Sequence, residues 1–409
     1  MEVRHMLSAL WRTRTGPILI AVQIALALAA LVNVAFLIVL RLNTYSQPTG
    51  IDVDNIFWVS TVSYASDYDQ KTALESDLQW LNSLPGVIAA SAALSIPQTY
   101  WGFGLPFSAS PDDKSLRDGA RVYPMTARGL ESLGVKLAAG RTYSPESVTP
   151  VSSDVGGALG QWGPEVVITK ALADRLFPKG DALGKTLYVG LVNKSSKIVG
   201  LIGTLQAAPI SGPFARYANQ VVLVGISPPG PNANYLIRTQ PARQAEVMVR
   251  VEKEFADRVP GRYVSQIQTL ARTASNTRNG LRTGSIILGV VTLLVLAVSA
   301  IGIFGLAVFN VTTRTKQIGT RRAIGARKLH ILRYFLVENW LITTSGVVVG
   351  CVLALTTGVI ISRMTQAPRL PLYYLVGGVL FVWMLGLLSV LVPARRAADI
   401  SPAIATRTV

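Results

Sequence analysis

The chain has 409 residues, of which half are hydrophobic and 15% are charged. These values exclude an ordinary soluble protein and are typical of a membrane protein with a sizeable soluble part. The formal net charge of +17 raises the question of nucleic-acid binding, but the basic residues lie beside apolar segments rather than among the aromatic residues of one domain. The charge therefore favours membrane orientation, and no nucleic-acid partner is expected.

Four apolar segments are each long enough to cross a membrane as a helix. The first follows a basic stretch and ends in Ile38-Val-Leu-Arg-Leu, which is not a small-residue cleavage site, so we expect an uncleaved anchor rather than a signal peptide. The third contains Gly346 and Gly350, a spacing that permits close helix packing inside the subunit or at a dimer seam. The segments cover residues 18–40, 286–308, 341–361 and 372–392.

The distribution of lysine and arginine predicts the orientation of these spans. Residues 1–15 carry three basic residues, the segment 311–335 carries seven and the C-terminal tail carries three, against two in the short loop 362–371. The positive-inside rule therefore places both termini and the segment 311–335 in the cytoplasm. The roughly 240 residues between the first two spans lie on the outer side, since long domains cross the membrane largely regardless of their charge.

The outer segment is expected to be an α+β domain split by an insertion. It begins with a strand-helix-strand unit, in which Leu74, Leu78 and Leu81 have helical spacing, and it ends with a similar unit. A Gly- and Pro-rich middle lies between them, so both ends should form one lobe that carries an inserted β-rich lobe. The expected strands are 56–62, 87–96, 235–239 and 262–266, and the expected helices are 70–84 and 241–259.

Inside the insertion, residues 165–177 indicate a strand followed by a helix, and 185–189 and 197–201 indicate paired strands. The intervening residues 180–186 resemble a phosphate-binding loop at first sight. Their glycines, however, are separated by three residues instead of four, and the segment follows a helix and opens a strand, which reverses the order that a nucleotide loop needs. We expect a turn here and no nucleotide.

Nothing in the sequence indicates catalysis or metal binding. No paired carboxylates and no nucleophile beside a base can be identified. The single cysteine, Cys351, lies in the third apolar segment, where we expect a buried packing role. The two histidines, His5 and His330, are far apart and make a poor metal site.

The expected fold is thus a membrane protein with four transmembrane α-helices and a large α+β extracytoplasmic domain. The boundaries are 1–15 for the cytoplasmic N-terminus, 16–41 for the first span, 42–283 for the outer domain (54–98 and 232–268 for the membrane-proximal lobe, 99–231 for the inserted distal lobe and 269–283 for a stalk), 284–310 for the second span, 311–335 for a cytoplasmic coupling loop, 336–361 for the third span, 362–371 for the short outer loop, 372–393 for the fourth span and 394–409 for the cytoplasmic C-terminus.

Three groups of residues carry a resemblance to a known family. The basic stretch 312–333, followed by a span with Glu338 near its start, resembles the loop after the second span in permeases of the MacB/FtsX type of ABC transporter. Residues 393–403 resemble the C-terminal ending of the same family. Residues 140–143, 166–177 and 183–187 resemble parts of the family's outer domain. All these matches fall in the right order among the four predicted spans.

The resemblance implies a dimer of four-span subunits, formed with a second copy or a homologous permease and driven by a cytoplasmic ABC ATPase dimer. Relatives of the macrolide-exporter kind can carry a fused ATPase before the first span. Only 15 residues precede that span here, so a separate ATPase chain is expected to bind ATP and Mg, and no cofactor is expected on this chain. Gln317 and Thr320 stand where the family usually has an acidic and an aliphatic residue, which is compatible with pairing to a non-identical permease.

Within this family, closure of the ATPases would push a helix around 317–326. We expect the second span to continue into that helix, because an unbroken helix transmits displacement well. Small residues would fit a groove on the ATPase, with arginines at its edge or on lipid phosphate. The alternative is a basic loop that merely anchors to anionic membrane lipid. The candidate coupling residues are Gln317, Gly319, Arg321, Arg322, Ala323, Gly325 and Ala326.

The resemblance implies a multi-pass protein of the bacterial inner membrane with a periplasmic outer domain. Export of a peptide, an antibiotic or another small compound is the favoured function, and an exporter could also engage a periplasmic adaptor and an outer-membrane channel. The alternatives are a regulator of a cell-wall hydrolase and a lipoprotein-releasing permease. The size of the outer domain favours the exporter over the regulator, since a regulator of this family typically has a smaller one.

Overall fold

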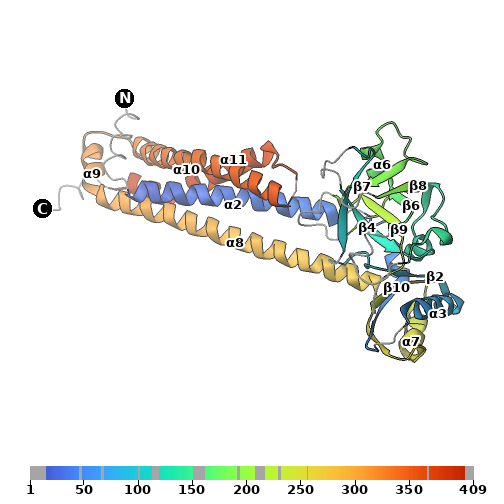
Figure 1. Ribbon diagram of the computed structural model, residues 1–409. Helices are drawn as coiled ribbons and strands as arrows, with labels where there is room; N and C mark the ends of the chain where they lie inside the picture. Colours follow the sequence, from blue (N-terminus) through green and yellow to red (C-terminus); the bar gives the residue numbers. More distant parts are fainter. Residues whose placement is uncertain are drawn as a thin grey trace. The chain divides into compact units, whose positions relative to one another are not determined.

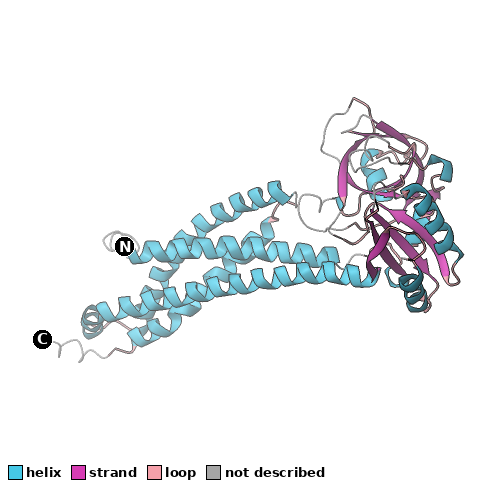
Figure 2. Cartoon of the chain, turned by 60° about the horizontal axis from the view of Figure 1, so that its bottom comes forward, coloured by secondary structure: helices cyan, strands magenta, loops and turns pink. Residues whose placement is uncertain are grey.

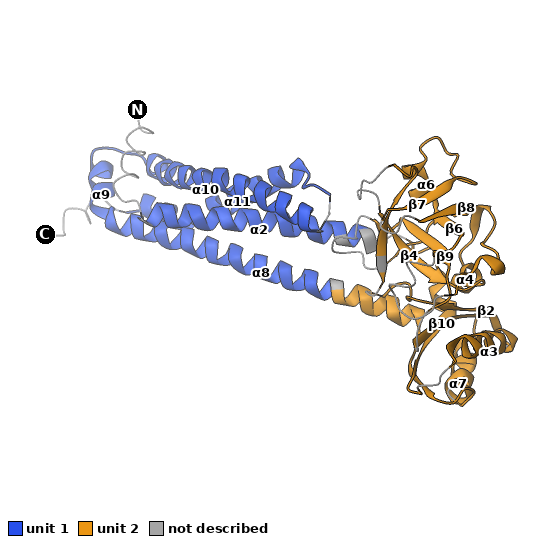
Figure 3. Ribbon diagram, viewed as in Figure 1, with its two compact units in different colours: residues 1–43, 282–364, 368–409 blue, residues 44–281, 365–367 orange. Residues whose placement is uncertain are grey.

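The computed structural model describes residues 15–45, 48–65, 69–99, 102–112, 119–150, 162–190, 194–207, 217–228, 232–255, 257–365 and 368–400. The chain divides into two compact units, one of residues 1–43, 282–364 and 368–409 and the other of residues 44–281 and 365–367 (Figure 3). Several residues used above lie outside the described ranges. They are Arg4, His5, Arg12, Arg14 and Arg407, together with residues 401–403.

The first unit consists of helices. Among the described residues, four helices are long and apolar enough to cross a membrane, and the views in Figures 1 and 2 show their apolar lengths side by side. A fifth, short helix, α9, connects two of them. The helices are α2 (Thr15–Tyr45), α8 (Leu270–Thr313, whose first turns belong to the other unit), α9 (Thr315–Ala323), α10 (Lys328–Thr365) and α11 (Leu372–Ala398).

Close contacts between α2 and α10 hold this bundle together. A Cβ atom placed on Gly346 would lie 2.7 Å from the Ala21 carbonyl oxygen, and one on Gly350 would lie 3.0 Å from the Ala25 Cα atom. The two glycines thus serve packing within the subunit, as the first of the two readings predicted. Asn33 adds a polar contact, donating from Nδ2 to the Ala354 carbonyl at 3.1 Å.

The second unit corresponds to the expected outer domain and is called the outer unit below. Its described residues form an 11-stranded sheet, and the first part of this sheet brings together the two ends of the segment 44–281. Strand β1 pairs antiparallel with both β10 and β11, and β10 also pairs with β2. Helices α3 and α7 pack on one face of these strands through a core that includes Phe57, Leu81, Val251 and Phe255. The elements are β1 (Ile56–Ser63), α3 (Gln70–Ser83), β2 (Val87–Ala93), β10 (Asn232–Thr239), α7 (Gln244–Glu254) and β11 (Arg262–Thr269).

A buried ion pair links α3, near the start of the segment 44–281, to β11, near its end. Asp77 of α3 accepts hydrogen bonds from Arg262 of β11, one of them from Nη2 at 2.8 Å, and from the Tyr235 hydroxyl at 2.6 Å. The side chains of Asp77 and Arg262 are both fully buried. Arg262 also donates to the Phe255 carbonyl at 2.9 Å, so the pair is embedded in further hydrogen bonds.

The inserted part forms a closed barrel. The strands follow the order β4-β3-β7-β8-β6-β9, and β9 returns to pair parallel with β4 from Arg121 to Met125. Closure leaves these strands without a free edge. The elements are β3 (Phe103–Ser108), β4 (Gly119–Met125), α4 (Gly129–Leu133), β5 (Leu137–Gly140, which pairs with β8), β6 (Glu165–Thr169), α6 (Lys170–Leu176), β7 (Thr186–Val189), β8 (Lys194–Ile202) and β9 (Val221–Gly225).

These elements confirm the expected fold class, with four membrane-length helices and a large outer α/β domain. Residues 180–185 form a turn between α6 and β7, with Gly180 and Gly184 at φ +77° and +81°, as predicted, and Thr186 begins β7. Strands β3, β4, β5 and β9 were not predicted. The helices also extend into the segment 311–335 from both sides, since α8 ends at Thr313 and α10 begins at Lys328.

Candidate functional site

The candidate site is the turn region formed by α9 and the first turns of α10. The prediction that the second span continues into this region as one helix is wrong, because Arg314 adopts a non-helical conformation between α8 and α9. The backbone hydrogen bonds nevertheless continue, from Arg314 N to Asn310 O at 3.2 Å and from Ile318 N to Arg314 O at 2.9 Å. The junction is therefore a bonded kink rather than a free hinge.

The side chain of Arg314 explains the kink. Its Nη1 donates to both Glu338 carboxylate oxygens at 3.0 Å and to the Tyr334 hydroxyl at 3.1 Å. Glu338 is buried on α10, and Arg314 is its partner. The Arg321 guanidinium lies over the Tyr334 ring, 5.4 Å from its centroid, within the range of a cation–π contact. These contacts fasten α9 to α10.

A second set of contacts fastens the region to the end of α11. Arg322 Nη1 donates to the Ala398 carbonyl at 2.7 Å, where a cation also complements the C-terminal end of the helix dipole. Lys328 Nζ donates to Asp399 Oδ1 at 2.6 Å, and this hydrogen bond holds the pKa of Asp399 below its usual value. The α9 helix therefore has fixed neighbours on both α10 and α11.

The predicted coupling residues divide into two groups in the structure. Gln317, Arg321, Ala323 and Gly325 are exposed, whereas Gly319 is buried, and Arg322 and Ala326 are half-buried against the helices. Gly319 therefore presents little surface to another protein. Gly325 has φ +101° and open space around its Cα, so a residue with a side chain would be strained there for backbone reasons alone.

The prediction missed two exposed apolar residues. Ile324, between α9 and Gly325, is 82% exposed, and Leu329 at the start of α10 is 69% exposed. Both interrupt a basic stretch, which is the one signal in the sequence that could have identified them. The pairing of Arg314 with Tyr334 and Glu338, and of Lys328 with Asp399, was not predicted, because it depends on the folded bundle.

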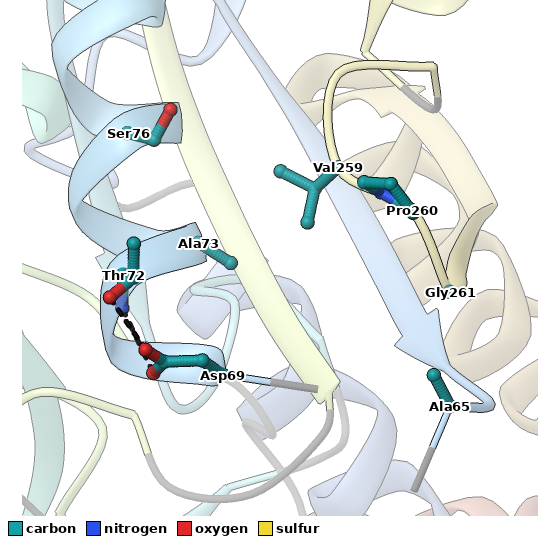
Figure 4. A pocket seen from close by; sticks show the side chains of 8 residues that line it. All are labelled: Ala65, Asp69, Thr72, Ala73, Ser76, Val259, Pro260 and Gly261. Atoms are coloured by element: carbon teal, nitrogen blue, oxygen red, sulfur yellow. Dashed lines mark hydrogen bonds between the residues drawn. The ribbon is translucent and has the colours of Figure 1, made fainter. Parts of the chain in front are cut away.

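No candidate metal site is found among the described residues. They contain no group of three or more His, Cys, Asp or Glu side chains placed to hold a metal. A pocket of about 340 Å³ in the outer unit contains one ionisable group, Asp69, which caps α3 by accepting the Thr72 N–H at 3.2 Å and the Thr72 hydroxyl at 2.6 Å (Figure 4). Its lining is Ala65, Asp69, Thr72, Ala73, Ser76, Val259, Pro260 and Gly261.

Comparison with known proteins extends over almost the whole chain. The family described as MacB-like periplasmic core domain matches residues 18–269, and the family described as FtsX-like permease C-terminal matches residues 289–402. The Macrolide export ATP-binding/permease protein MacB of Marinobacter nauticus is 26% identical over 341 residues, which is 81% of this chain and 48% of that protein. This chain thus spans about half the length of that relative.

One further relative and one solved structure match more than half of this chain. The protein of Bacillus subtilis named Uncharacterized ABC transporter permease YknZ is 23% identical over 350 residues, 83% of this chain and 80% of that protein. The solved periplasmic region of MacB from Actinobacillus actinomycetemcomitans aligns with a TM-score of 0.32 and 11% identity, covering 58% of this chain and 98% of that one. On the family matches, this chain belongs to the MacB/FtsX family of ABC transporter permeases.

Proposed function

We propose that this permease couples ATP hydrolysis by a separate cytoplasmic ATPase dimer to movement of its outer domain. The observation that carries the proposal is the exposed apolar pair Ile324 and Leu329 on a turn region that three side-chain contacts hold to α10 and α11. Arg314 binds Glu338, Arg322 binds the end of α11, and Lys328 binds Asp399. An apolar surface on a rigid support is suited to receive a push from a partner, because the support yields little.

Helix α8 supplies a path for the movement. It is one helix of 44 residues, which at 1.5 Å per residue extends over roughly 66 Å. Its first turns are bonded to the outer unit, since the Trp58 indole donates to Thr273 Oγ1 at 2.8 Å and Thr277 Oγ1 donates to the Gln98 carbonyl at 2.7 Å. Displacement at the kinked end of α8 would therefore reach β1 and the loop after β2 without a transport path through the lipid-spanning helices.

The remaining parts of the proposal follow from the family and the charge distribution. The chain would lie in the bacterial inner membrane with both termini in the cytoplasm and the outer domain in the periplasm. It would pair with a second copy or a homologous permease, and ATP and Mg would bind to the ATPase. Export of a peptide, an antibiotic or a similar small compound is the transport activity we favour, in keeping with the name of the macrolide-export relative. A periplasmic adaptor and an outer-membrane channel would complete an exporter of this kind.

The test is to replace the apolar contacts by charge. Ile324→Asp and Leu329→Asp should each reduce co-purification of the ATPase subunits roughly tenfold or more, since central apolar anchors commonly dominate such interfaces. Val249→Asp is the matched control, because Val249 is also apolar and 66% exposed but lies on α7 of the outer unit. Unchanged ATPase binding in both turn variants would refute the proposal.

A further inference from the structure

Arg121 of β4 is a buried arginine whose positive charge is only partly accommodated. It is 2% exposed, and its Nη1 donates to the Gly102 carbonyl at 3.2 Å. Its Nη2 has no hydrogen-bond partner among the described residues. Arginine keeps its charge in proteins, and a buried charge without a counter-ion is costly. A buried, unsatisfied polar group in a folded protein calls for an explanation, and a bound ion or water molecule is one.

A second unsatisfied donor points to the same place. Ser95, in the loop after β2, is 1% exposed, and its hydroxyl has no hydrogen-bond partner among the described residues. A Cβ atom built on Gly102 would lie 2.6 Å from Arg121 Nη2 and 3.6 Å from Ser95 Oγ. Both unsatisfied groups therefore lie beside the Gly102 Cα, where only glycine avoids a clash with the guanidinium.

The described side chains around Arg121 do not neutralise it. No carboxylate of the described residues forms a salt bridge with Arg121. The phenol of Tyr123 lies next to the guanidinium, but burial raises the pKa of Tyr123, so that phenol is neutral at physiological pH. The described polar side chains near the guanidinium are thus two neutral groups, the Ser95 hydroxyl and the Tyr123 phenol.

We propose that Arg121, Ser95 and Gly102 form a binding site for a small monovalent anion of the size of chloride or acetate. The guanidinium would supply the charge and one N–H donor, and the Ser95 hydroxyl would supply a second donor. Arg121 and Ser95 are almost fully buried and the guanidinium lies close against Gly102, so a bulky anion would not fit between the two donors. The proposal is independent of ATPase binding, because every residue of the site belongs to the outer unit.

The site also adjoins the start of α8. Ser95 lies three residues before Gln98, a buried residue in the left-handed conformation at φ +67°, which is strained for a residue other than glycine. The Gln98 side chain donates to the Gln206 carbonyl at 2.7 Å, and its own carbonyl accepts from Thr277 of α8. An anion that fixes Ser95 would therefore stabilise the loop that contacts α8.

The experiment measures the thermal unfolding of the full-length protein in detergent at constant ionic strength and pH. Sodium gluconate, which is too bulky for the site, is replaced stepwise by sodium chloride or sodium acetate. We expect a saturable rise in Tm of at least about 2 °C, because a ligand that binds only the folded state stabilises it. Arg121→Met should abolish the response, and Ser95→Ala should weaken anion affinity about tenfold, as expected for loss of a hydrogen bond to a charged group.

Ser196→Ala is the matched control for Ser95→Ala. Ser196 of β8 is also a buried serine, but its hydroxyl donates to the Gly163 carbonyl at 2.5 Å, so its loss should leave the anion response unchanged. If Arg121→Met does not fold, the contrast between the two serine variants decides. A response to chloride alone supports a halide site, and one to acetate alone supports a carboxylate site. No response to either anion, or equal responses in Ser95→Ala and Ser196→Ala, would overturn the proposal.

Discussion

The buried pair of Asp77 and Arg262 should contribute strongly to the stability of the outer unit. In Asp77→Ala, Arg262 remains fully buried without its carboxylate, and the Tyr235 hydroxyl loses its acceptor. Removing one partner of a buried ion pair costs about 3–5 kcal/mol. At about 2–4 °C per kcal/mol for a unit of this size, the Tm of the outer unit should fall by about 6–20 °C.

The assay is thermal unfolding of the full-length protein, followed by the fluorescence of tryptophans that include Trp58 and Trp80 of the outer unit. Removing both charges in Asp77→Leu with Arg262→Met should recover most of the loss, because two apolar side chains leave no buried charge. Glu254→Ala is the control, since its pair with Arg250 is about half exposed and should matter by less than about 1 kcal/mol. The reasoning fails if Asp77→Ala lowers the Tm no more than Glu254→Ala does. It also fails if the double variant has a lower Tm than Asp77→Ala.

Three further predictions concern the bundle, the coupling region and the barrel. Gly346→Ala should destabilise the helical unit by about 1–3 kcal/mol through overpacking on α2. Gly305→Ala should be neutral, because nothing lies within 4 Å of its Cβ position. Thermal unfolding of the two variants tests this difference. Glu338→Ala and Arg314→Met should each reduce ATPase stimulation by the permease, because either change removes the ion pair that holds α9 on α10. Full stimulation in both variants would contradict the holding role of Arg314. The Arg141 hydrogen bond holds the pKa of Glu165 below its usual range, so this pair should stabilise the barrel above the unfolded-state pKa of about 4.3 and lose that contribution as the pH falls through the lower folded-state value. Glu165→Gln should therefore flatten the dependence of Tm on pH between about 5 and 3, and an equally steep profile in that variant would count against the pair.

The helices of both units were largely predictable from local patterns, whereas the barrel was not. Apolar runs locate the spans, and Leu74, Leu78 and Leu81 reveal α3 because their spacing reports the buried face directly. Strands β3 and β4 contain Pro106 and Pro124, which argue against a strand in the sequence. Barrel closure depends on pairing of β4 with β9, about a hundred residues apart, and no local periodicity records such a contact.

In the turn region formed by α9 and the first turns of α10, too, some features follow from local sequence and others from contacts with distant residues. Its basic character, and the exposure of Gln317, Arg321, Ala323 and Gly325, follow from a polar stretch between two apolar runs. The burial of Gly319 and the exposure of Ile324 do not, because both result from how α9 packs on neighbouring helices. Hydrophobicity alone would have assigned these two residues the opposite way round.

The barrel is inserted at a point where its two ends meet. The chain leaves the first part of the sheet after Ala93 of β2 and returns at β10, where Asn234 is the direct antiparallel partner of Ala93. A polypeptide of almost any length can be accommodated between two residues that are already neighbours, since closing a longer loop adds little entropic cost. The inserted barrel could therefore be exchanged for another domain during evolution or by engineering. The register of β11, β1, β10 and β2, and the attachment of this part of the sheet to α8, would stay the same.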